Sequence, residues 1–113
     1  MVEAARRFRP VLEAADFQVP EISVLSNFTG EAHDPDTNSI RSRLFLQLFN
    51  PVLWYRNLLT TREQGATLYI EFGGGLGKGE APADKRPNLE SIVKKTFRGD
   101  ETPPDYLLSL IHI

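Results

Sequence analysis

The sequence predicts an α/β fold in which helices surround a short parallel sheet. The first observation is the order of its segments, because stretches with helical spacing of apolar residues alternate with two short apolar stretches typical of strands. The second is the composition: 113 residues with 41% hydrophobic and 25% charged residues are ordinary for one small globular domain. The third is the number of strands. Two strands are few for an independent sheet, so the chain is predicted to be part of a larger one.

Charge and cysteine content exclude several classes of protein. Thirteen Lys and Arg against fifteen Asp and Glu give a net charge of −2, so no basic surplus indicates nucleic acid. The chain has no Cys, which excludes disulfide scaffolds, Cys-based zinc sites and thiol nucleophiles. No apolar run approaches the roughly 18 to 20 residues of a membrane span, and the N-terminus lacks the apolar stretch of a signal peptide. We expect a cytoplasmic protein without nucleic-acid or membrane partners.

The first third of the chain predicts one helix, one strand and one loop. Apolar residues at steps of three and four form a helical stripe: Met1, Ala5, Phe8, Leu12 and Ala15. Pro10 lies inside this pattern and should kink or shorten the helix, because it removes a backbone donor. A strand is expected over residues 21–25, which are rich in β-branched and apolar side chains, and residues 27–38 should form a polar loop.

A second helix is predicted to start near Ile40, with Asn38 or Ser39 as its N-cap. Its apolar face comprises Ile40, Leu44 and Leu48. At about 100° per residue, Gln47 lies about 20° from Ile40 and points along the same face. A lone Gln on an apolar helix face is usually a hydrogen-bonded core residue. The alternative is that its side chain or backbone orients a neighbour in a functional site.

A third helix should follow, with Asn50 as its cap and Pro51 in its first turn, where a missing N–H costs nothing. Its apolar stripe comprises Val52, Tyr55 and Leu59. Gly65 stands at the position of a helix stop.

The remaining residues predict a strand, a short helix and a tail. Residues 67–72 form the strand, and residues 89–97 have the spacing of a helix. Residues 99–113 combine a charged, Pro-containing linker with an apolar run that resembles a strand or helix cut short. We therefore assign residues 1–98 to the domain and 99–113 to a linker and tail.

Local motifs for chemistry are weak. The glycine cluster at 73–79 follows a strand, but its spacing fits neither a P-loop nor a dinucleotide fingerprint, so a tight turn is the better interpretation. His33 with Asp34 and Asp36 could hold a metal, but no second histidine lies at helical spacing, which favours a solvated loop. No Ser occupies a Gly-x-Ser-x-Gly elbow, so a self-contained Ser/His catalyst is not predicted.

Three blocks nevertheless carry a resemblance. Residues 22–30 are ISVLSNFTG, Arg41 is followed by QLFNPVLW at 47–54, and Gly65 precedes YIEFGGG at 69–75. In this order they resemble the PVxSNxTG, QLxxPVxW and G…fxEvGPG blocks of the malonyl-CoA:acyl carrier protein transacylase family, over roughly residues 1 to 80. Residues 1–12 are similar to the helix after the family's FHSxxM segment. Gly74 stands where the family has proline.

The resemblance implies an acyltransferase mechanism. An elbow serine attacks the malonyl thioester of coenzyme A, a histidine takes its proton, and the phosphopantetheine thiol of acyl carrier protein then attacks the acyl-serine. An arginine pairs with the malonyl carboxylate. The family's glutamine falls on Gln47, whose main-chain carbonyl would orient the histidine. No cofactor is expected, because malonyl-CoA is a substrate and phosphopantetheine belongs to the partner, acyl carrier protein.

The serine, arginine and histidine would all precede Met1. The resemblance therefore implies a partial C-terminal piece of the hydrolase-like acyltransferase subdomain, which carries one supporting residue, Gln47. Such a piece would need the N-terminal part of its own domain as a partner and would be inactive alone. The alternative is a non-catalytic acyltransferase-like module that docks a carrier protein or a partner domain. An unrelated small α/β protein is the third interpretation.

Overall fold

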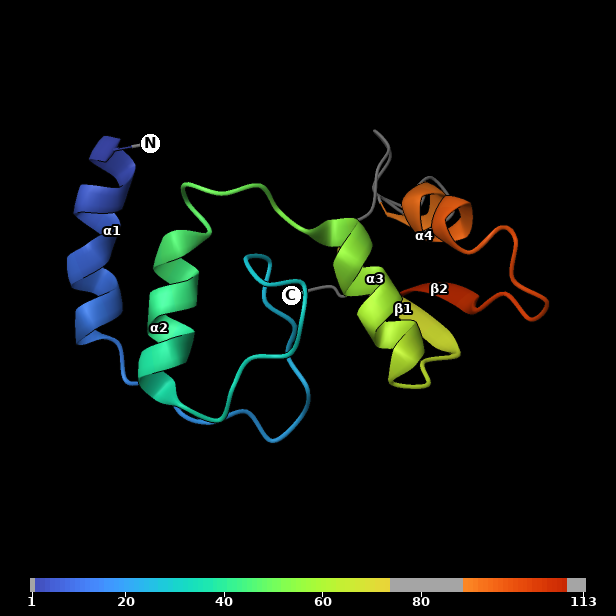
Figure 1. The fold of residues 1–113 in the computed structure, drawn as a ribbon, viewed down its shortest axis with the longest axis horizontal. Coiled ribbons are helices and arrows are strands. Elements are labelled where there is room, and N and C mark those ends of the chain that lie inside the picture. The colour runs from blue at the N-terminus through green and yellow to red at the C-terminus, as the bar shows by residue number, and fades with distance from the viewer. Residues whose placement is uncertain (1, 74–88, 110–113) are drawn as a thin grey trace. The chain divides into compact units, whose positions relative to one another are not determined.

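The structure is a computed structural model that describes residues 2–73 and 89–109. It confirms the α/β class and the short parallel sheet. The elements in chain order are α1 (Val2–Ala14), α2 (Thr37–Leu46), α3 (Trp54–Glu63), β1 (Leu68–Phe72), α4 (Glu90–Thr96) and β2 (Asp105–Ser109) (Figure 1). They form two compact units, residues 1–60 and residues 61–113. No helix in the described ranges is long and apolar enough to cross a membrane.

The first unit has α1 and α2 side by side (Figure 1). Helix α1 forms where predicted, and it runs through Pro10 to Ala14, so the proline does not shorten it. Two residues of the predicted stripe, Ala5 and Leu12, are buried, as is Ile40 of α2. The two helices are in contact, and these buried aliphatic side chains give the unit a small core.

Helix α2 begins at Thr37, earlier than predicted. Asp36 is its N-cap, and its carboxylate accepts the N–H of Asn38 at 3.0 Å. The predicted caps, Asn38 and Ser39, are therefore wrong, because both already lie inside the helix. A carboxylate is a better partner for the positive end of the helix dipole than either neutral side chain, which accounts for the choice of Asp36.

The strand predicted over residues 21–25 does not form; a single antiparallel bridge joins Leu25 to Ala32. The backbone reverses directly after it, since the N–H of Gly30 donates to the Ser26 carbonyl at 2.9 Å. This reversal pairs the segment with the residues that follow it. It leaves too short a stretch for a strand.

Helix α3 differs from the prediction at its start. It begins at Trp54, so Pro51 precedes the helix and does not lie in its first turn. Asn50 does not cap α3. Its side-chain amide donates to the Leu46 carbonyl at 2.8 Å and so closes the end of α2. The reason is proximity, because the last carbonyls of a helix lack partners within that helix and Asn50 follows α2 closely.

The buried face of α3 also differs. The predicted stripe of Val52, Tyr55 and Leu59 is exposed, whereas Asn57 and Leu58 are buried. The helix turns this second face toward the chain reversal at 26–30, which supplies hydrogen-bond partners as well as apolar contacts. The predicted helix stop is confirmed: Gly65 has φ +93°, and its N–H donates to the Arg62 carbonyl at 3.0 Å.

The second unit contains the parallel sheet. Strand β1 lies within the predicted range, and it pairs with β2, with Ile70 opposite Leu107. The second strand thus comes from the segment assigned to the linker and tail, and not from residues 21–25. Helix α4 lies within the predicted range 89–97.

Helix α4 covers one face of this sheet. Val93 of α4 and Phe97 at its C-cap are buried. The Phe97 ring stacks on Tyr69 of β1 with 5.7 Å between ring centroids. The guanidinium of Arg62 lies 5.5 Å from the centre of the Phe97 ring. The last turn of α3 and helix α4 therefore share the Tyr69 face.

Gly30→Ala should destabilise the first unit. Gly30 has φ +71°, and an added Cβ would lie 2.6 Å from Cγ and Cδ of Arg56 and 2.9 Å from its Cβ. We expect a loss of about 1–3 kcal/mol in the free energy of unfolding, because a left-handed backbone and an overfilled contact both oppose the methyl group. Denaturant unfolding followed by Trp54 fluorescence measures it, since the chain has one Trp.

Gly99→Ala is the matched control, because nothing lies within 4 Å of its added Cβ. A Gly30→Ala variant as stable as Gly99→Ala would contradict the close packing of the reversal on α3.

Candidate functional site

Gln47, the predicted supporting residue, is the C-cap of α2. Its backbone is helical, with φ −62° and ψ −19°, and its N–H donates to the Arg43 carbonyl at 3.1 Å. The residue is half-buried. Within the described part of the chain, neither its carbonyl oxygen nor its side-chain amide has a hydrogen-bond partner. The end of α2 therefore presents a main-chain acceptor, and the orientation of a histidine by it stays a prediction.

The turn after Gln47 is held tightly. The N–H groups of Leu48 and Phe49 donate to the carbonyls of Phe45 and Leu46 at 3.2 and 3.1 Å. The side chain of Asn50 adds its bond to Leu46. These short-range bonds tighten the last turn of α2 and fix the plane of the peptide that carries the Gln47 oxygen.

The chain reversal at 26–30 joins the first two motif blocks. Ser26 is 2% exposed, and its hydroxyl accepts the N–H groups of Phe28 and Thr29 at 3.1 and 3.3 Å. The carbonyl of Asn27 accepts the N–H of Leu53 at 2.9 Å. The resemblance to PVxSNxTG and QLxxPVxW thus has a structural counterpart, because the reversal holds the segment that leads into α3.

A buried amide pair strengthens this junction. Asn57 is 5% exposed, and its side-chain amide donates to the Asn27 side-chain oxygen at 3.3 Å. The Thr60 hydroxyl donates to the Gly30 carbonyl at 2.6 Å. Arg56 and Glu31 form an exposed ion pair at 3.0 Å. Three residues of α3 therefore contact this one short reversal.

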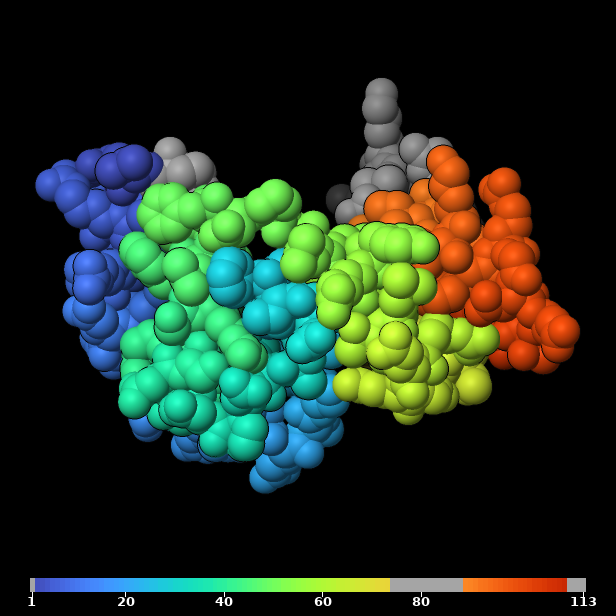
Figure 2. Space-filling model, viewed as in Figure 1, coloured from blue at the N-terminus to red at the C-terminus, as the bar shows by residue number. Residues whose placement is uncertain are grey.

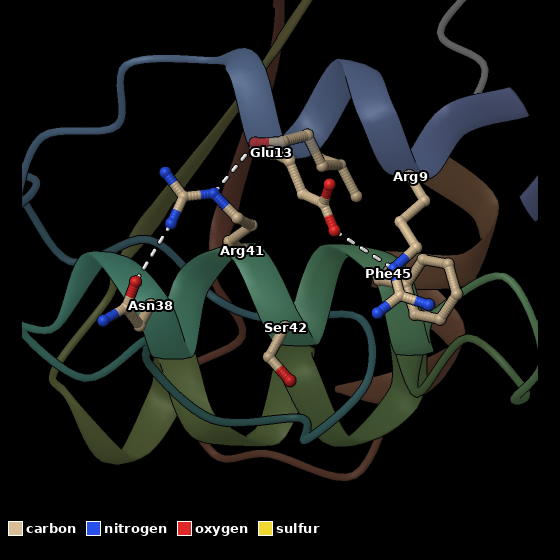
Figure 3. A pocket seen from close by; sticks show the side chains of 7 residues that line it. Arg9, Glu13, Asn38, Arg41, Ser42 and Phe45 are labelled. Atoms are coloured by element: carbon tan, nitrogen blue, oxygen red, sulfur yellow. Dashed lines mark hydrogen bonds and ion pairs between the residues drawn. The ribbon is translucent and has the colours of Figure 1, made fainter. Parts of the chain in front are cut away.

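Arg41 anchors α2 to the end of α1. Its Nε donates to the Leu12 carbonyl at 2.8 Å and its Nη1 to the Asn38 side-chain oxygen at 3.0 Å (Figure 3). Its Nη2 donates to the Ala15 carbonyl at 3.2 Å. The guanidinium also lies 5.1 Å from the centre of the Phe17 ring. Carbonyls at a helix C-terminus lack internal partners, so a cation with a planar fork suits this place.

A cavity of about 270 Å³ lies beside Arg41, between α1 and α2 (Figure 3). Leu12 and Phe45 give it apolar walls. Arg9 and Glu13, one turn apart on α1, form an ion pair at 3.1 Å in its lining. Arg41 also lines the cavity, and its guanidinium donates to the carbonyls of Leu12 and Ala15 and to Asn38.

Of the candidate metal ligands His33, Asp34 and Asp36, the two carboxylates have other partners. Asp34 pairs with Arg43 at 2.9 Å. In the space-filling view the cyan atoms of the chain before α2 lie next to the green atoms of α2 (Figure 2). Asp36 caps α2. Burial, followed by the charge of Arg43, lowers the pKa of His33, and Asp34 opposes this shift. Within the described residues, no three His, Cys, Asp or Glu side chains lie together in a way that could hold a metal ion.

The third motif block contains a polar contact that sequence reasoning missed. The carboxylate of Glu71 accepts the N–H of Leu89 at 2.7 Å and the hydroxyl of Tyr106. Burial, then this hydrogen bond and the negative charge of Glu71, raise the pKa of Tyr106 well above its ordinary value. One carboxylate thus ties β1 to β2 and to the start of α4. Of the glycine cluster at 73–79, only Gly73 is described; Gly74 and the phosphate-loop question lie outside the described residues.

Sequence patterns could have identified only some of the residues that form these contacts. Arg41 belongs to a motif block, but its place on the polar side of a short helix gave no indication of its partners. Asn57 is polar at a buried position, and only the amide of Asn27, thirty residues earlier, explains it. Tyr106 was hidden in the apparent tail.

Comparisons with known proteins agree in part with the resemblance. The chain is 29% identical over 75 residues to the malonyl CoA-acyl carrier protein transacylase of Bacillus subtilis, a match that covers 66% of this chain and 23% of the relative. It is 38% identical over 55 residues to the mitochondrial malonyl CoA-acyl carrier protein transacylase of Schizosaccharomyces pombe, covering 48% of this chain and 17% of the relative.

A third relative is the polyketide biosynthesis protein ThaF of Burkholderia thailandensis, 32% identical over 75 residues, which are 66% of this chain and 6% of the relative. The matched segment thus spans less than a quarter of each of these relatives. No model of a known protein family matches the chain, and no solved structure matches it. The comparisons therefore give similarity to part of such transacylases.

Arg41→Lys should weaken the contact between α1 and α2. A lysine keeps the charge but cannot donate to Leu12, Ala15 and Asn38 in one planar arrangement. We expect the free energy of unfolding to fall by about 1–3 kcal/mol, measured by denaturant unfolding with Trp54 fluorescence. Arg7→Lys is the control, because Arg7 makes only an exposed ion pair with Glu3. Equal stability of the two variants would rule out an anchoring role for the guanidinium fork.

The Tyr106 hydroxyl should make the stability of the second unit pH-dependent. Its pKa is raised on folding, so above about pH 10 the unfolded chain loses this proton while the folded chain keeps it. The free energy of unfolding must then fall as the pH rises. Tyr106→Phe lacks this proton, so we expect its stability deficit of about 1 kcal/mol near pH 8 to shrink toward about pH 11.

Thermal unfolding followed by far-ultraviolet circular dichroism measures this difference. Tyr55→Phe is the control, because Tyr55 is exposed, and its difference from the unmodified chain should not change with pH. If the stability deficit of Tyr106→Phe stayed constant from about pH 8 to about pH 11, the Tyr106 proton would not contribute to the pH dependence of stability.

Proposed function

We propose that this chain is part of a serine-dependent acyltransferase that moves a malonyl group from coenzyme A to the phosphopantetheine thiol of an acyl carrier protein. The observation that carries the proposal is the main-chain acceptor at Gln47, which lies at the end of α2 in a chain similar to part of two transacylases of that name. The serine and the histidine belong to residues outside this chain.

The chemistry proceeds in two balanced steps. The serine oxygen attacks the malonyl thioester carbon, the histidine takes the serine proton, and coenzyme A leaves with that proton as its free thiol. The phosphopantetheine thiol then attacks the malonyl-serine ester, its proton returns to the serine through the histidine, and malonyl leaves on the carrier protein. No electron is transferred, so no redox cofactor is required.

The contribution of this chain is to hold the histidine. The Gln47 carbonyl accepts the N–H of one ring nitrogen, which leaves the other nitrogen unprotonated and able to take the serine proton. A carbonyl does not titrate, so this orientation holds across the working pH range. The bonds to Arg43 and Leu46 that close α2 support the proposal, because they fix the peptide next to this oxygen.

A chimeric enzyme tests the proposal. The matched segment of the Bacillus subtilis transacylase is replaced by the corresponding 75 residues of this chain, and malonyl transfer to acyl carrier protein is measured. Leu48→Pro should lower kcat by about 100-fold, because a residue before proline leaves the helical region and the Gln47 carbonyl turns away. Gln47→Ala keeps the carbonyl and should retain most of the activity.

Two controls accompany the chimera. Circular dichroism and Trp54 fluorescence must show that Leu48→Pro still folds, and its pH–rate profile should show an altered basic limb for the histidine. The unmodified 113-residue chain by itself should transfer no malonyl group. Turnover by the chain alone, or equal losses in Gln47→Ala and Leu48→Pro, would contradict the proposed role.

A further inference from the structure

A closed ring of three hydrogen bonds lies at the start of α3. The N–H of Leu53 donates to the Asn27 carbonyl at 2.9 Å, and the Leu53 carbonyl accepts the N–H of Asn57 at 2.9 Å. The side chain of Asn57 closes the ring, because its Nδ2 donates to the side-chain oxygen of Asn27 at 3.3 Å. Both backbone groups of Leu53 are therefore held, one by the reversal at 26–30 and one by α3.

Leu53 ends the connection that begins directly after Gln47, residues 48–53. The first residues of this connection bond back to the last turn of α2. Pro51 has a fixed φ and restricts the residue before it. Because the connection is short and constrained at both ends, a displacement of Leu53 must be absorbed by the peptides between it and Gln47.

We propose that Asn57 is a positioning residue for the Gln47 carbonyl. The proposal rests on the proposed function, in which this carbonyl orients the histidine that takes the serine proton. Asn57 bonds to Asn27 and Leu53, so it acts through the point at which the connection from α2 enters α3. A reacting group displaced by about 1 Å can lose about 100-fold in rate, so a small shift at this point is sufficient.

The burial of Asn57 indicates a role other than packing. The residue is 5% exposed, and within the described part of the chain its Oδ1 is buried without a hydrogen-bond partner. A buried amide with an unpaired oxygen is less favourable than an apolar side chain of similar size. Its Nδ2, by contrast, completes the ring. The donor is therefore the part of this side chain that the structure uses.

A second contact joins the chain near the reversal to α2, and it is weaker. Asp34 pairs with Arg43 at 2.9 Å, but the Asp34 side chain is 61% exposed. Exposed ion pairs contribute little, because water and salt screen them. The bond from the buried amide of Asn57 is shielded from water and is the better candidate for holding one geometry.

The chimeric transacylase provides the test, since any 75 consecutive residues of a 113-residue chain include Asn57. Asn57→Leu removes the donor at similar volume. We expect kcat for malonyl transfer to fall about tenfold and KM for malonyl-CoA to stay within about twofold, because the histidine is misaligned while substrate binding is untouched. The midpoint of the pH–rate profile that reports the histidine should move to lower pH, because its protonated ring loses an aligned acceptor.

Thr60→Val is the matched control. It also removes a hydrogen bond from α3 to the reversal, the one from the Thr60 hydroxyl to the Gly30 carbonyl, but Thr60 does not belong to the ring around Leu53. It should lower the stability and leave kcat and the pH midpoint unchanged. If circular dichroism shows that Asn57→Leu does not fold, Asn57→Ser takes its place with the same expected result, because its hydroxyl is too short to reach Asn27.

The outcomes separate this proposal from the proposed function. Loss of kcat in Asn57→Leu and Leu48→Pro, but not in Thr60→Val, would support both. An active Asn57→Leu beside an impaired Leu48→Pro would overturn the role of Asn57 and leave that of Gln47 intact. Equal changes in Asn57→Leu and Thr60→Val would also overturn it, since general destabilisation would explain them. An unimpaired Leu48→Pro would contradict the proposed role of Gln47 and this proposal with it.

Discussion

The arrangement of the first unit depends on the guanidinium of Arg41. It donates to the last carbonyls of α1, at Leu12 and Ala15, and to Asn38 in the first turn of its own helix. None of these acceptors is a carboxylate. The positive charge is instead offset by the negative end of the α1 dipole and by the face of Phe17. One side chain thereby sets where α1 ends and how α2 lies along it.

Hydrogen bonds carry so much of this arrangement because the core is small. Six hydrophobic side chains are buried in the described residues of both units together. Burial of Ala5, Leu12 and Ile40 favours association of the two helices, but the hydrophobic effect is not directional. Directional bonds from Arg41, Ser26 and Asn57 then select one orientation, which is the condition for holding a single carbonyl in place at Gln47.

Local sequence patterns correctly predicted features that depend on neighbouring residues alone. The first helix, the stop at Gly65 and the helix at 89–97 follow from spacing and from glycine's freedom at positive φ, and the structure has all three. The buried face of α3 and the pairing of the strands depend instead on residues far away in the sequence. Val52, Tyr55 and Leu59 have perfect helical spacing, yet α3 buries Asn57 because Asn27 offers it an amide partner. Residues 21–25 have the composition of a strand, but the reversal after Ser26 pairs them only with the short segment that follows, through one bridge from Leu25 to Ala32. Residues 105–109 instead pair with β1 along their whole length.

Gln47, proposed as a supporting residue, shows why such a residue is harder to find in a sequence than a reacting one. A reacting side chain has a chemical type that can be searched for, whereas a main-chain acceptor exists at every residue and is distinguished only by where its peptide points. The pattern around Gln47 left two interpretations open, a hydrogen-bonded core amide and a group that orients a neighbour. The structure places the residue at the end of α2, where the helix ceases to use its own carbonyls. The informative part of QLFNPVLW is therefore the stop after the glutamine, since Asn50 closes the helix and Pro51 prevents its continuation. Within the described residues, the Gln47 carbonyl then has no hydrogen-bond partner.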